Sequence, residues 1–386
     1  MTKKRTYEQI NKKIKDGKAV VVTAEEIIPI VEEKGIEKAT EEIDVVTTGT
    51  FGPMCSSGAI INLGHSDPPI RMQKAWLNDV EAYAGLAAVD VYLGATQASD
   101  SQGTQYGGAH VIEDLISGKR IKFKAISQGT DCYPRKKIET YITKESINQA
   151  ILFNPRNCYQ NYNVAVNTSN KKIYTYMGVL LPRLANATYS TSGQLSPLLN
   201  DPKFLTIGIG TRIFLGGAQG YIAWEGTQHS PQSIKNKDGV EINKGATLTV
   251  IGNLKEMSTD YIRAAIFKGY GISLIVGIGI PIPIINSEIM KYVAVKNEEI
   301  FTEVIDYSVP HLNKPSLGRV NYKQLRDGEI SIQGKTIPTS ALSSYAKARE
   351  IAQKLKEEIS GGKFLLQKPI QNLPVKEELK SLKEIE

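Results

Sequence analysis

The chain has 386 residues, of which 41% are hydrophobic and 23% charged, as is typical of a globular protein with a sizeable core. No run of eighteen apolar residues occurs, so we expect no transmembrane helix and no membrane partner. The basic N-terminus has no apolar segment behind it, so we expect no secretory signal and a cytoplasmic location. Much of the net charge of +7 lies near the two ends, so nucleic-acid binding is not expected.

The N-terminal region has a β-α-β pattern. An amphipathic helix is expected at residues 6–16, and a capping box at Thr23-Ala24-Glu25-Glu26 predicts a second helix that ends near Gly35. Apolar runs predict strands at residues 19–23, 43–48 and 59–63. This alternation predicts an α/β fold of mixed sheets, with β-α-β units and helices packed on the sheet faces.

A second β-α-β unit is expected later, with a strand at 247–251, a helix at 258–268 and a strand at 272–278. The apolar stretch 271–285 contains glycines and prolines, so we expect a buried strand that leads into a proline-rich loop. Further helices are expected near residues 75–90, 107–117 and 144–152. Short β-like runs lie at residues 121–126, 138–142, 163–166, 173–179, 205–209 and 221–224.

No clean linker occurs before about residue 310, and no internal repeat is visible. We therefore expect one large interwoven catalytic domain over residues 1–360. Its last element is an amphipathic helix from Thr339 to Ser360, which Gly361-Gly362 should end. Residues 361–386 are rich in Lys and Glu and are expected to form a C-terminal tail.

The three cysteines are the first candidates for chemistry, because a cytoplasmic chain with three cysteines does not indicate disulfides. Cys55 lies in G-T-F-G-P-M-C-S-S-G, where glycines let the backbone approach a ligand and successive amides suit an anion. Cys132 lies in S-Q-G-T-D-C-Y-P-R-K-K, where downstream basic residues favour the reactive thiolate and Asp131 opposes it. Cys158, in N-P-R-N-C-Y-Q-N-Y, is the weakest candidate. For each of them the alternative is a structural thiol.

Two histidines are candidates for ligand contacts. His65 lies in N-L-G-H-S-D-P-P-I-R-M with Asp67 and Arg71 close by, which suits an acid/base or carboxylate-binding role. His110 opens a predicted helix in Y-G-G-A-H-V-I-E-D-L. No histidine has a metal-binding spacing such as H-E-x-x-H, so each is also open to a structural role, and no metal site is predicted.

Polar, turn-rich segments suit a pocket for a small amino-acid-like ligand. These segments are N-P-R-N-C-Y-Q-N-Y, T-Y-M-G, G-Q-L-S-P-L-L-N-D-P and E-G-T-Q-H. In such a pocket Arg156 or Arg212 would bind a carboxylate, and an acid such as Asp201 would bind an ammonium group. Arg212 belongs to the glycine-rich run 207–220, which resembles an anion cradle but lacks a P-loop ending.

Six long runs carry a family resemblance. They are G-H-S-D-P-P-I-R-M (64–72), Y-G-G-A-H-V-I-E-D-L (106–115), G-T-D-C-Y-P-R-K (129–136), N-P-R-N-C-Y-Q (154–160), G-Q-L-S-P-L-L-N-D-P (193–202) and G-T-R-I-F-L-G-G (210–217). With these runs the chain resembles the homocysteine biosynthesis family, the L-aspartate semialdehyde sulfurtransferases of methanogenic archaea and some anaerobic bacteria. The resemblance extends from about residue 8 to about residue 360.

The resemblance implies an enzyme that makes homocysteine from aspartate semialdehyde and sulfide, with electrons from a partner that carries ferredoxin-type iron–sulfur clusters. The family's reactive cysteines fall on Cys55 and Cys132, whereas alanine is expected in many members where this chain has Cys158. Sulfide or a cysteine persulfide would add to the aldehyde, and His65 or a backbone amide near Cys55 would stabilise the oxyanion. Some members carry C-terminal CBS domains, for which this chain ends too early, so nucleotide sensing is not expected.

We also consider two alternatives. In the first, Cys55, Cys132 and Cys158 hold a [4Fe–4S] cluster that binds sulfide for the same reaction, although their spacing fits no local ferredoxin pattern. In the second, the chain is a non-catalytic, redox-sensing binding protein. We expect no other cofactor, and we expect the chain to form a homo-oligomer.

Overall fold

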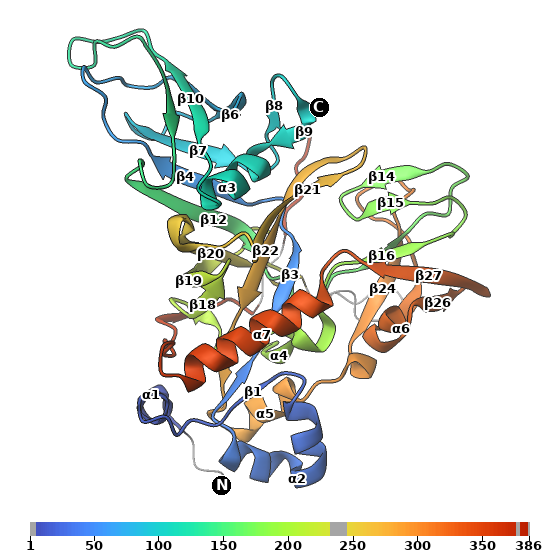
Figure 1. Ribbon diagram of the computed structural model, residues 1–386. Helices are drawn as coiled ribbons and strands as arrows, with labels where there is room; N and C mark the ends of the chain where they lie inside the picture. Colours follow the sequence, from blue (N-terminus) through green and yellow to red (C-terminus); the bar gives the residue numbers. More distant parts are fainter. Residues whose placement is uncertain (1–4, 232–244, 376–378, 385–386) are drawn as a thin grey trace.

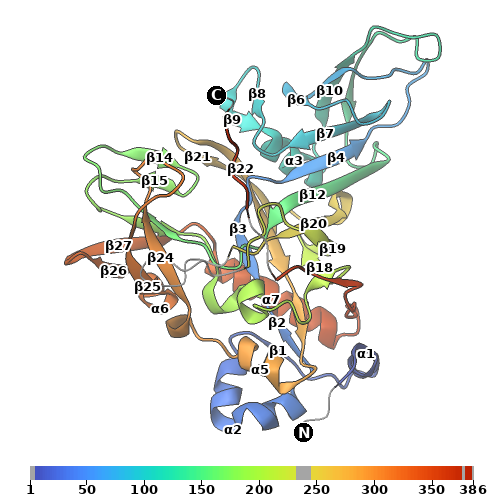
Figure 2. The ribbon, with the colours of Figure 1, turned by 180° about the vertical axis from the view of Figure 1, so that it is seen from behind.

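The computed structural model describes residues 5–231, 245–375 and 379–384, and it is rich in strands. Figures 1 and 2 show a central sheet with one lobe above it, a second lobe to its side, and three helices below it. These helices are α1 (Tyr7–Lys15), α2 (Ile27–Glu42) and α5 (Ser287–Val293). The predicted mixed α/β class is confirmed, because parallel and antiparallel strand pairs occur together. Within the three described ranges, no helix is long and apolar enough to cross a bilayer.

The N-terminal β-α-β unit forms as predicted. Strands β1 (Val21–Thr23) and β2 (Val45–Thr47) pair in parallel, and α2 crosses between them. The capping box is present, because the Thr23 amide donates to Glu26 Oε2 (2.8 Å) and the Glu26 amide donates to Thr23 Oγ1 (3.2 Å). Gly35 has a φ of 78°, which interrupts the helix where its end was predicted, and helical structure resumes after it.

A nine-stranded sheet forms the centre of the molecule, in the order β21-β22-β18-β19-β20-β12-β4-β7, with β3 paired to β22. Its strands are β3 (Thr50–Pro53), β4 (Gly58–Asn62), β7 (Asp90–Gly94), β12 (Gln149–Asn157), β18 (Arg212–Leu215), β19 (Ala218–Glu225), β20 (Leu248–Asn253), β21 (Ile262–Phe267) and β22 (Gly271–Gly279). All of its neighbouring pairs are antiparallel. The sheet therefore needs no helical crossovers.

Two predictions about this region are wrong. Residues 258–268 do not form a crossover helix, because β21 folds back on β22 as a hairpin whose turn contains Gly269 at a φ of 70°. The stretch after β22 is not a loop but strand β23 (Pro281–Pro283), which pairs with β2. Because β23 lies at the edge of its sheet, the absent proline N–H groups are tolerated there.

The upper lobe holds a six-stranded sheet in the order β11-β10-β5-β6-β8-β9, packed beside α3 (Gly108–Ile116). Its strands are β5 (Lys74–Leu77), β6 (Val80–Ala82), β8 (Ala98–Ser99), β9 (Gly103–Gly107), β10 (Ile121–Ile126) and β11 (Lys137–Ile142). The helix predicted near 107–117 is confirmed as α3. The helix predicted near 75–90 is wrong, because Asn78 and Asp79 both have positive φ values and form a tight hairpin turn between β5 and β6. The helix predicted near 144–152 is also wrong, since β12 begins at Gln149 and pairs with β4 and β20.

The side lobe contains a second six-stranded sheet, in the order β25-β24-β13-β16-β27-β26, together with the short hairpin β14-β15. Its strands are β13 (Val164–Val166), β16 (Ala187–Tyr189), β24 (Phe301–Asp306), β25 (Ser316–Asn321), β26 (Glu329–Ile332) and β27 (Lys335–Ala341), and α6 (Tyr322–Asp327) covers it. The run predicted as one strand at 173–179 is the hairpin of β14 (Ile173–Thr175) and β15 (Gly178–Leu180). Short helix α4 (Pro197–Asn200) lies between this lobe and the centre.

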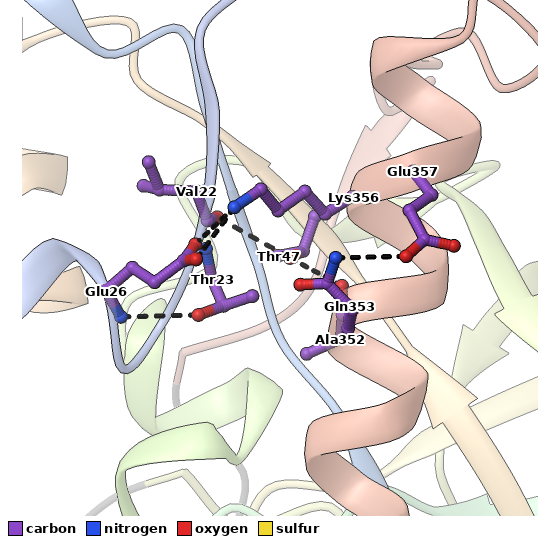
Figure 3. A network of polar contacts seen from close by, with 8 residues as sticks. All are labelled: Val22, Thr23, Glu26, Thr47, Ala352, Gln353, Lys356 and Glu357. Carbon is purple, nitrogen blue, oxygen red and sulfur yellow. Dashed lines mark hydrogen bonds and ion pairs between the residues drawn. The ribbon is translucent and has the colours of Figure 1, made fainter.

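Helix α7 (Tyr345–Ser360) packs against β3 and β22, and it begins six residues after the predicted start because residues 335–341 form β27. Glycines allow its close approach, since a Cβ atom on Gly49 would lie 2.1 Å from the Ala348 carbonyl oxygen. Figure 3 shows polar contacts that tie the helix to β1 and β2. Thr47 Oγ1 donates to the Ala352 carbonyl (2.8 Å), and Lys356 Nζ contacts the Glu26 carboxylate at 2.7 Å.

The chain continues to pack after α7. Phe364 and Leu366 are buried in the same apolar cluster as α1 and α7, and the Leu366 amide donates to Asn11 Oδ1 at 2.8 Å. Strand β28 (Gln371–Asn372) then pairs with β17 (Gly208–Ile209). The segments before and after α7 are thus both packed against the rest of the fold, which holds the helix in place.

We predict that Gly49→Ala lowers the free energy of unfolding by about 2–3 kcal/mol, because the added methyl group overlaps a backbone carbonyl of α7 that cannot rotate away. Guanidinium denaturation would measure the change. Gly94→Ala is the matched control, since its Cβ would meet no atom closer than 3.9 Å. Equal stability of the two variants would show that α7 does not approach the sheet this closely.

Candidate active site

A cavity of about 510 Å³ lies where the central sheet meets the side lobe. Its lining comes from the β3–β4 loop, the end of β12, the turns of the β14–β15 and β21–β22 hairpins, and the segments around residues 190–197 and 342. All four polar segments singled out in the sequence contribute to it, through Arg156, Tyr176, Ser196 and Gln228. The sequence therefore identified many of the segments that line the cavity, but it did not show that they come together in one place.

Cys55 follows β3 directly and lines the cavity, half-buried. Its Sγ lies 3.3 Å from Ser273 Oγ, on the buried strand β22. The backbone beside it is fixed, because the Met54 amide donates to the Leu274 carbonyl (2.7 Å). The thiol is therefore held at a set place on the cavity wall, with a hydroxyl positioned to donate to the thiolate form.

The loop around Cys55 is held by side-chain hydrogen bonds, which leave two of its backbone N–H groups without an acceptor in the described chain. Ser57 Oγ donates to the Met54 carbonyl (2.8 Å), and Ser56 Oγ donates to Asn154 Oδ1 and to the Arg156 carbonyl, both at 3.0 Å. These side-chain bonds hold the turn, while the amide N–H groups of Cys55 and Ser56 have no protein acceptor among the described residues. Two adjacent free amides next to a thiol suit a developing negative charge.

Cys158 lies in the same cavity wall as Cys55, which the sequence did not predict. It is 2% exposed, and burial raises the pKa of its thiol, which disfavours the nucleophilic thiolate. Its φ of 50° is uncommon outside glycine and marks the sharp turn that ends β12. The only signal in the sequence was its place in a polar, turn-rich segment.

Arg156 points its side chain into the cavity from the end of β12. Its amide donates to Asn154 Oδ1 (2.8 Å), its Nε donates to Thr227 Oγ1 (3.1 Å), and its guanidinium also interacts with the phenol oxygen of Tyr159. Among the described residues that line the cavity, Arg156 is the only Arg or Lys, and none is Asp or Glu. An anionic group of a ligand would therefore bind here.

Four tyrosines line the cavity, and a fifth contacts one of them from outside the lining. They are Tyr159, Tyr162, Tyr176, Tyr270 and Tyr307. Neighbouring rings are 5.0–6.4 Å apart between centroids and steeply inclined to one another. Burial raises the pKa of the phenol groups of Tyr159, Tyr162 and Tyr307, so these stay neutral. Sequence reasoning missed this cluster because its members come from four separate segments without any periodic spacing.

Cys132 and His65 lie together, away from this cavity. The β10–β11 loop carries Cys132 at the tip of the upper lobe, where the thiol is exposed and 3.6 Å from Thr130 Oγ1. The His65 ring stacks on Tyr133 at 6.1 Å, and Arg135 donates to the backbone carbonyl of Asp67 at 2.6 Å. Figures 1 and 2 place β10 in the upper lobe and β3 at the centre. The two candidate reactive cysteines thus lie in different parts of this structure, Cys55 in the cavity and Cys132 on the upper lobe.

The remaining candidates are outside the cavity lining. Arg71 is exposed beside β5, and Arg212 lies on β18 with its Nε buried and without a partner in the described chain. His110 Nδ1 accepts from the Gly107 amide (3.2 Å) at the start of α3, and burial lowers its pKa. Asp201 accepts from the amides of its own loop, at 2.8 Å from Thr206, so its carboxylate is occupied by the fold. Of the two arginines proposed for a ligand carboxylate, the structure brings Arg156 to the cavity.

The three cysteines do not fit an iron–sulfur cluster in this arrangement. Cys55 and Cys158 share the cavity, but Cys132 lies at the tip of the upper lobe. Over the described ranges, no three side chains of His, Cys, Asp or Glu are grouped closely enough to hold a metal ion. A cluster bound by all three thiols would need a different conformation.

Comparison with known proteins gives a consistent result. The family described as homocysteine biosynthesis enzyme, sulfur-incorporation, matches residues 19–366. The L-aspartate semialdehyde sulfurtransferase of Methanosarcina acetivorans is 56% identical over 380 residues, which cover 98% of this chain and 74% of the relative. The protein of the same name from Methanocaldococcus jannaschii is 50% identical over 402 residues, covering 99% and 77%. No solved structure matches the chain.

We predict that Ser273→Ala slows alkylation of Cys55 by iodoacetamide at neutral pH about three- to tenfold, because the thiolate loses a hydroxyl donor. Mass spectrometry of the labelled peptides would give the rate. Cys132 in the same sample is the internal control, since Ser273 does not contact it and its labelling should not change. An unchanged rate at Cys55 would contradict a role for this hydrogen bond.

Proposed function

Because this chain belongs to the family of sulfur-incorporating homocysteine biosynthesis enzymes, we propose that it adds sulfur to L-aspartate semialdehyde and forms L-homocysteine. The observation that carries this proposal is a cavity lined by both Cys55 and Arg156, which is the one Arg or Lys among its described lining residues. The thiol suits sulfur chemistry at an aldehyde, and the guanidinium suits the α-carboxylate of an amino acid.

The overall reaction sets what the site has to do. Aspartate semialdehyde and hydrogen sulfide take up two electrons and two protons, and they give homocysteine and water. Sulfur adds to the aldehyde carbon, loss of water leaves a thioaldehyde, and the electron pair reduces this to the thiol. The electrons come from an external reductant, for which we propose a protein with ferredoxin-type clusters.

Cys55 is proposed to hold the incoming sulfur, either as hydrosulfide beside its Sγ or as a persulfide on it. When this sulfur adds to the aldehyde, the carbonyl oxygen becomes an oxyanion. The amide N–H groups of Cys55 and Ser56, which have no acceptor among the described residues, are proposed as its donors. His65 is not needed for this role, because it lies at the tip of the upper lobe.

Cys132 is proposed to act as the second thiol of a persulfide route. After the persulfide has added to the aldehyde, the Cys132 thiolate attacks Cys55 Sγ. The S–S bond to the substrate breaks, the substrate leaves with the added sulfur as a thiol, and a Cys55–Cys132 disulfide forms. A new sulfide then opens this disulfide and restores the persulfide and the free thiol. Since Cys132 is exposed on the β10–β11 loop, the route requires that loop to approach the cavity.

The proposed activity is tested by incubating the protein anaerobically with L-aspartate semialdehyde, sulfide and a reductant, and by following homocysteine by mass. We predict that Cys55→Ser reduces this rate at least a hundredfold, because the hydroxyl cannot hold sulfur at neutral pH. Cys158→Ala is the matched control from the same cavity, and it should keep more than half of the rate, since the buried thiol is not ionised. Full activity of Cys55→Ser would contradict the assignment.

We also predict that Arg156→Gln raises the KM for L-aspartate semialdehyde about tenfold with a smaller change in kcat, because a charged hydrogen bond to the carboxylate is lost. Steady-state kinetics at saturating sulfide would show this. Arg263→Gln, at an exposed position on β21, is the control and should keep the KM of the parent protein. A change in kcat alone would show that Arg156 does not bind the ground state.

A further inference from the structure

The cavity supplies a partner for only one of the two charged groups of an amino-acid substrate. Arg156 suits the α-carboxylate, but the described residues that line the cavity include no Asp or Glu for the α-ammonium group. Asp201, the acid expected from the sequence, is occupied by the amides of its own loop. An ammonium group that leaves water without a partner is strongly disfavoured, so another feature has to receive it.

The tyrosines are arranged as a wall of ring faces. The ring of Tyr176 lies 6.0 Å from that of Tyr270 and 6.4 Å from that of Tyr162, with interplanar angles of 61° and 68°. Tyr159 continues the wall beyond Tyr162, at 5.0 Å and 65°. Consecutive rings meet edge to face, and all four of these tyrosines line the same cavity, so the cavity has an aromatic wall. Such a wall is the arrangement that binds ammonium groups in proteins.

Hydrogen bonds within the cluster use up its phenol protons. Tyr307 donates to Asn163 Oδ1 (2.8 Å), so it accepts from Tyr176 at 3.0 Å, and Tyr176 in turn accepts from Tyr162 at 2.9 Å. The phenol protons of Tyr162, Tyr176 and Tyr307 are therefore engaged, so the Tyr162 and Tyr176 oxygens can act toward a ligand only as acceptors. Both the ring faces and these oxygens carry partial negative charge, which favours a cation and disfavours a second carboxylate.

The wall is also close to the reactive thiol. Burial raises the pKa of the Tyr159 and Tyr270 phenols, and both are near enough to Cys55 that a thiolate there adds to the rise, although Arg156 opposes it at Tyr159. In aspartate semialdehyde the ammonium group is only a few bonds from the aldehyde carbon. A substrate whose aldehyde lies at Cys55 therefore has its ammonium group within reach of these rings.

We propose that the ring faces of Tyr159, Tyr176 and Tyr270 form an aromatic site for the α-ammonium group of the substrate. This inference rests on the proposed function, and it gives the site a preference for aminated over deaminated four-carbon aldehydes. Arg156 and the tyrosine wall then orient the substrate between them, with the aldehyde toward Cys55.

Binding of two unreactive analogues tests this independently of turnover. L-homoserine and 4-hydroxybutanoate have an alcohol in place of the aldehyde and differ mainly by the ammonium group. Calorimetric titration should show that the parent protein prefers L-homoserine about tenfold. Tyr270→Leu should remove about fivefold of this preference, because a cation–π contact at a half-exposed ring is lost. Tyr270→Phe should keep the preference, because the ring remains.

Tyr141→Leu is the matched control, since Tyr141 is 56% exposed on β11 and Tyr270 is 48% exposed in its turn. It should not change the preference. The proposal is overturned if Tyr270→Leu weakens both analogues equally, if Tyr270→Phe behaves like Tyr270→Leu, or if the parent protein does not prefer L-homoserine. Selective binding without any homocysteine formation would support the ammonium site and would count against the proposed reaction alone.

Discussion

The close approach of α7 to β3 and β22 is the constraint on which the site depends. Gly49 and the two strand glycines Gly277 and Gly279 leave room for the helix, and any side chain there would meet α7 or a neighbouring backbone. The Ser344 amide at the start of the helix donates to the Phe51 carbonyl of β3 (2.9 Å). The strand that leads to Cys55 is thus paired with β22 along its edge and covered by a helix, so the thiol projects from a rigid element.

The tyrosine wall is built in another way. The tyrosines stand on hairpin turns and on the segment after β12, where the backbone is set by local turns and not by a ladder. Their position depends on one another, through ring contacts and the chain of phenol hydrogen bonds that ends at Asn163. The cavity thus combines a rigid segment that carries Cys55 with a wall of mutually supported aromatic rings. This division suits a reaction in which the attacking atom must be fixed while the substrate enters and leaves.

The sequence predicted those parts of the fold that depend on local signals. The capping box at Thr23–Glu26 and the strand 121–126 formed where expected, and the amphipathic helix α7 formed with its predicted end but a later start. The helices predicted at 75–90, 144–152 and 258–268 failed because distant strands compete for those backbones, and a pairing such as that of β12 with β4 and β20 has no local signal. The same holds for the site: residues with a local sequence signal were predicted, and those brought together by distant contacts were not. Cys55 follows a strand and Arg156 lies at the end of one, whereas the tyrosine wall arises from contacts between segments far apart in the sequence.

The separation of the two candidate cysteines is consistent with the demands of the chemistry. A thioaldehyde reacts readily with water and other thiols, so it has to be formed in an enclosed space such as the cavity beside Cys55. Sulfide equivalents and electrons, in contrast, arrive from outside, and an exposed thiol such as Cys132 can meet a protein donor that the cavity would exclude. In the proposed persulfide route Cys132 has to reach Cys55, and the β10–β11 loop that carries Cys132 is separate from the strand that leads to Cys55.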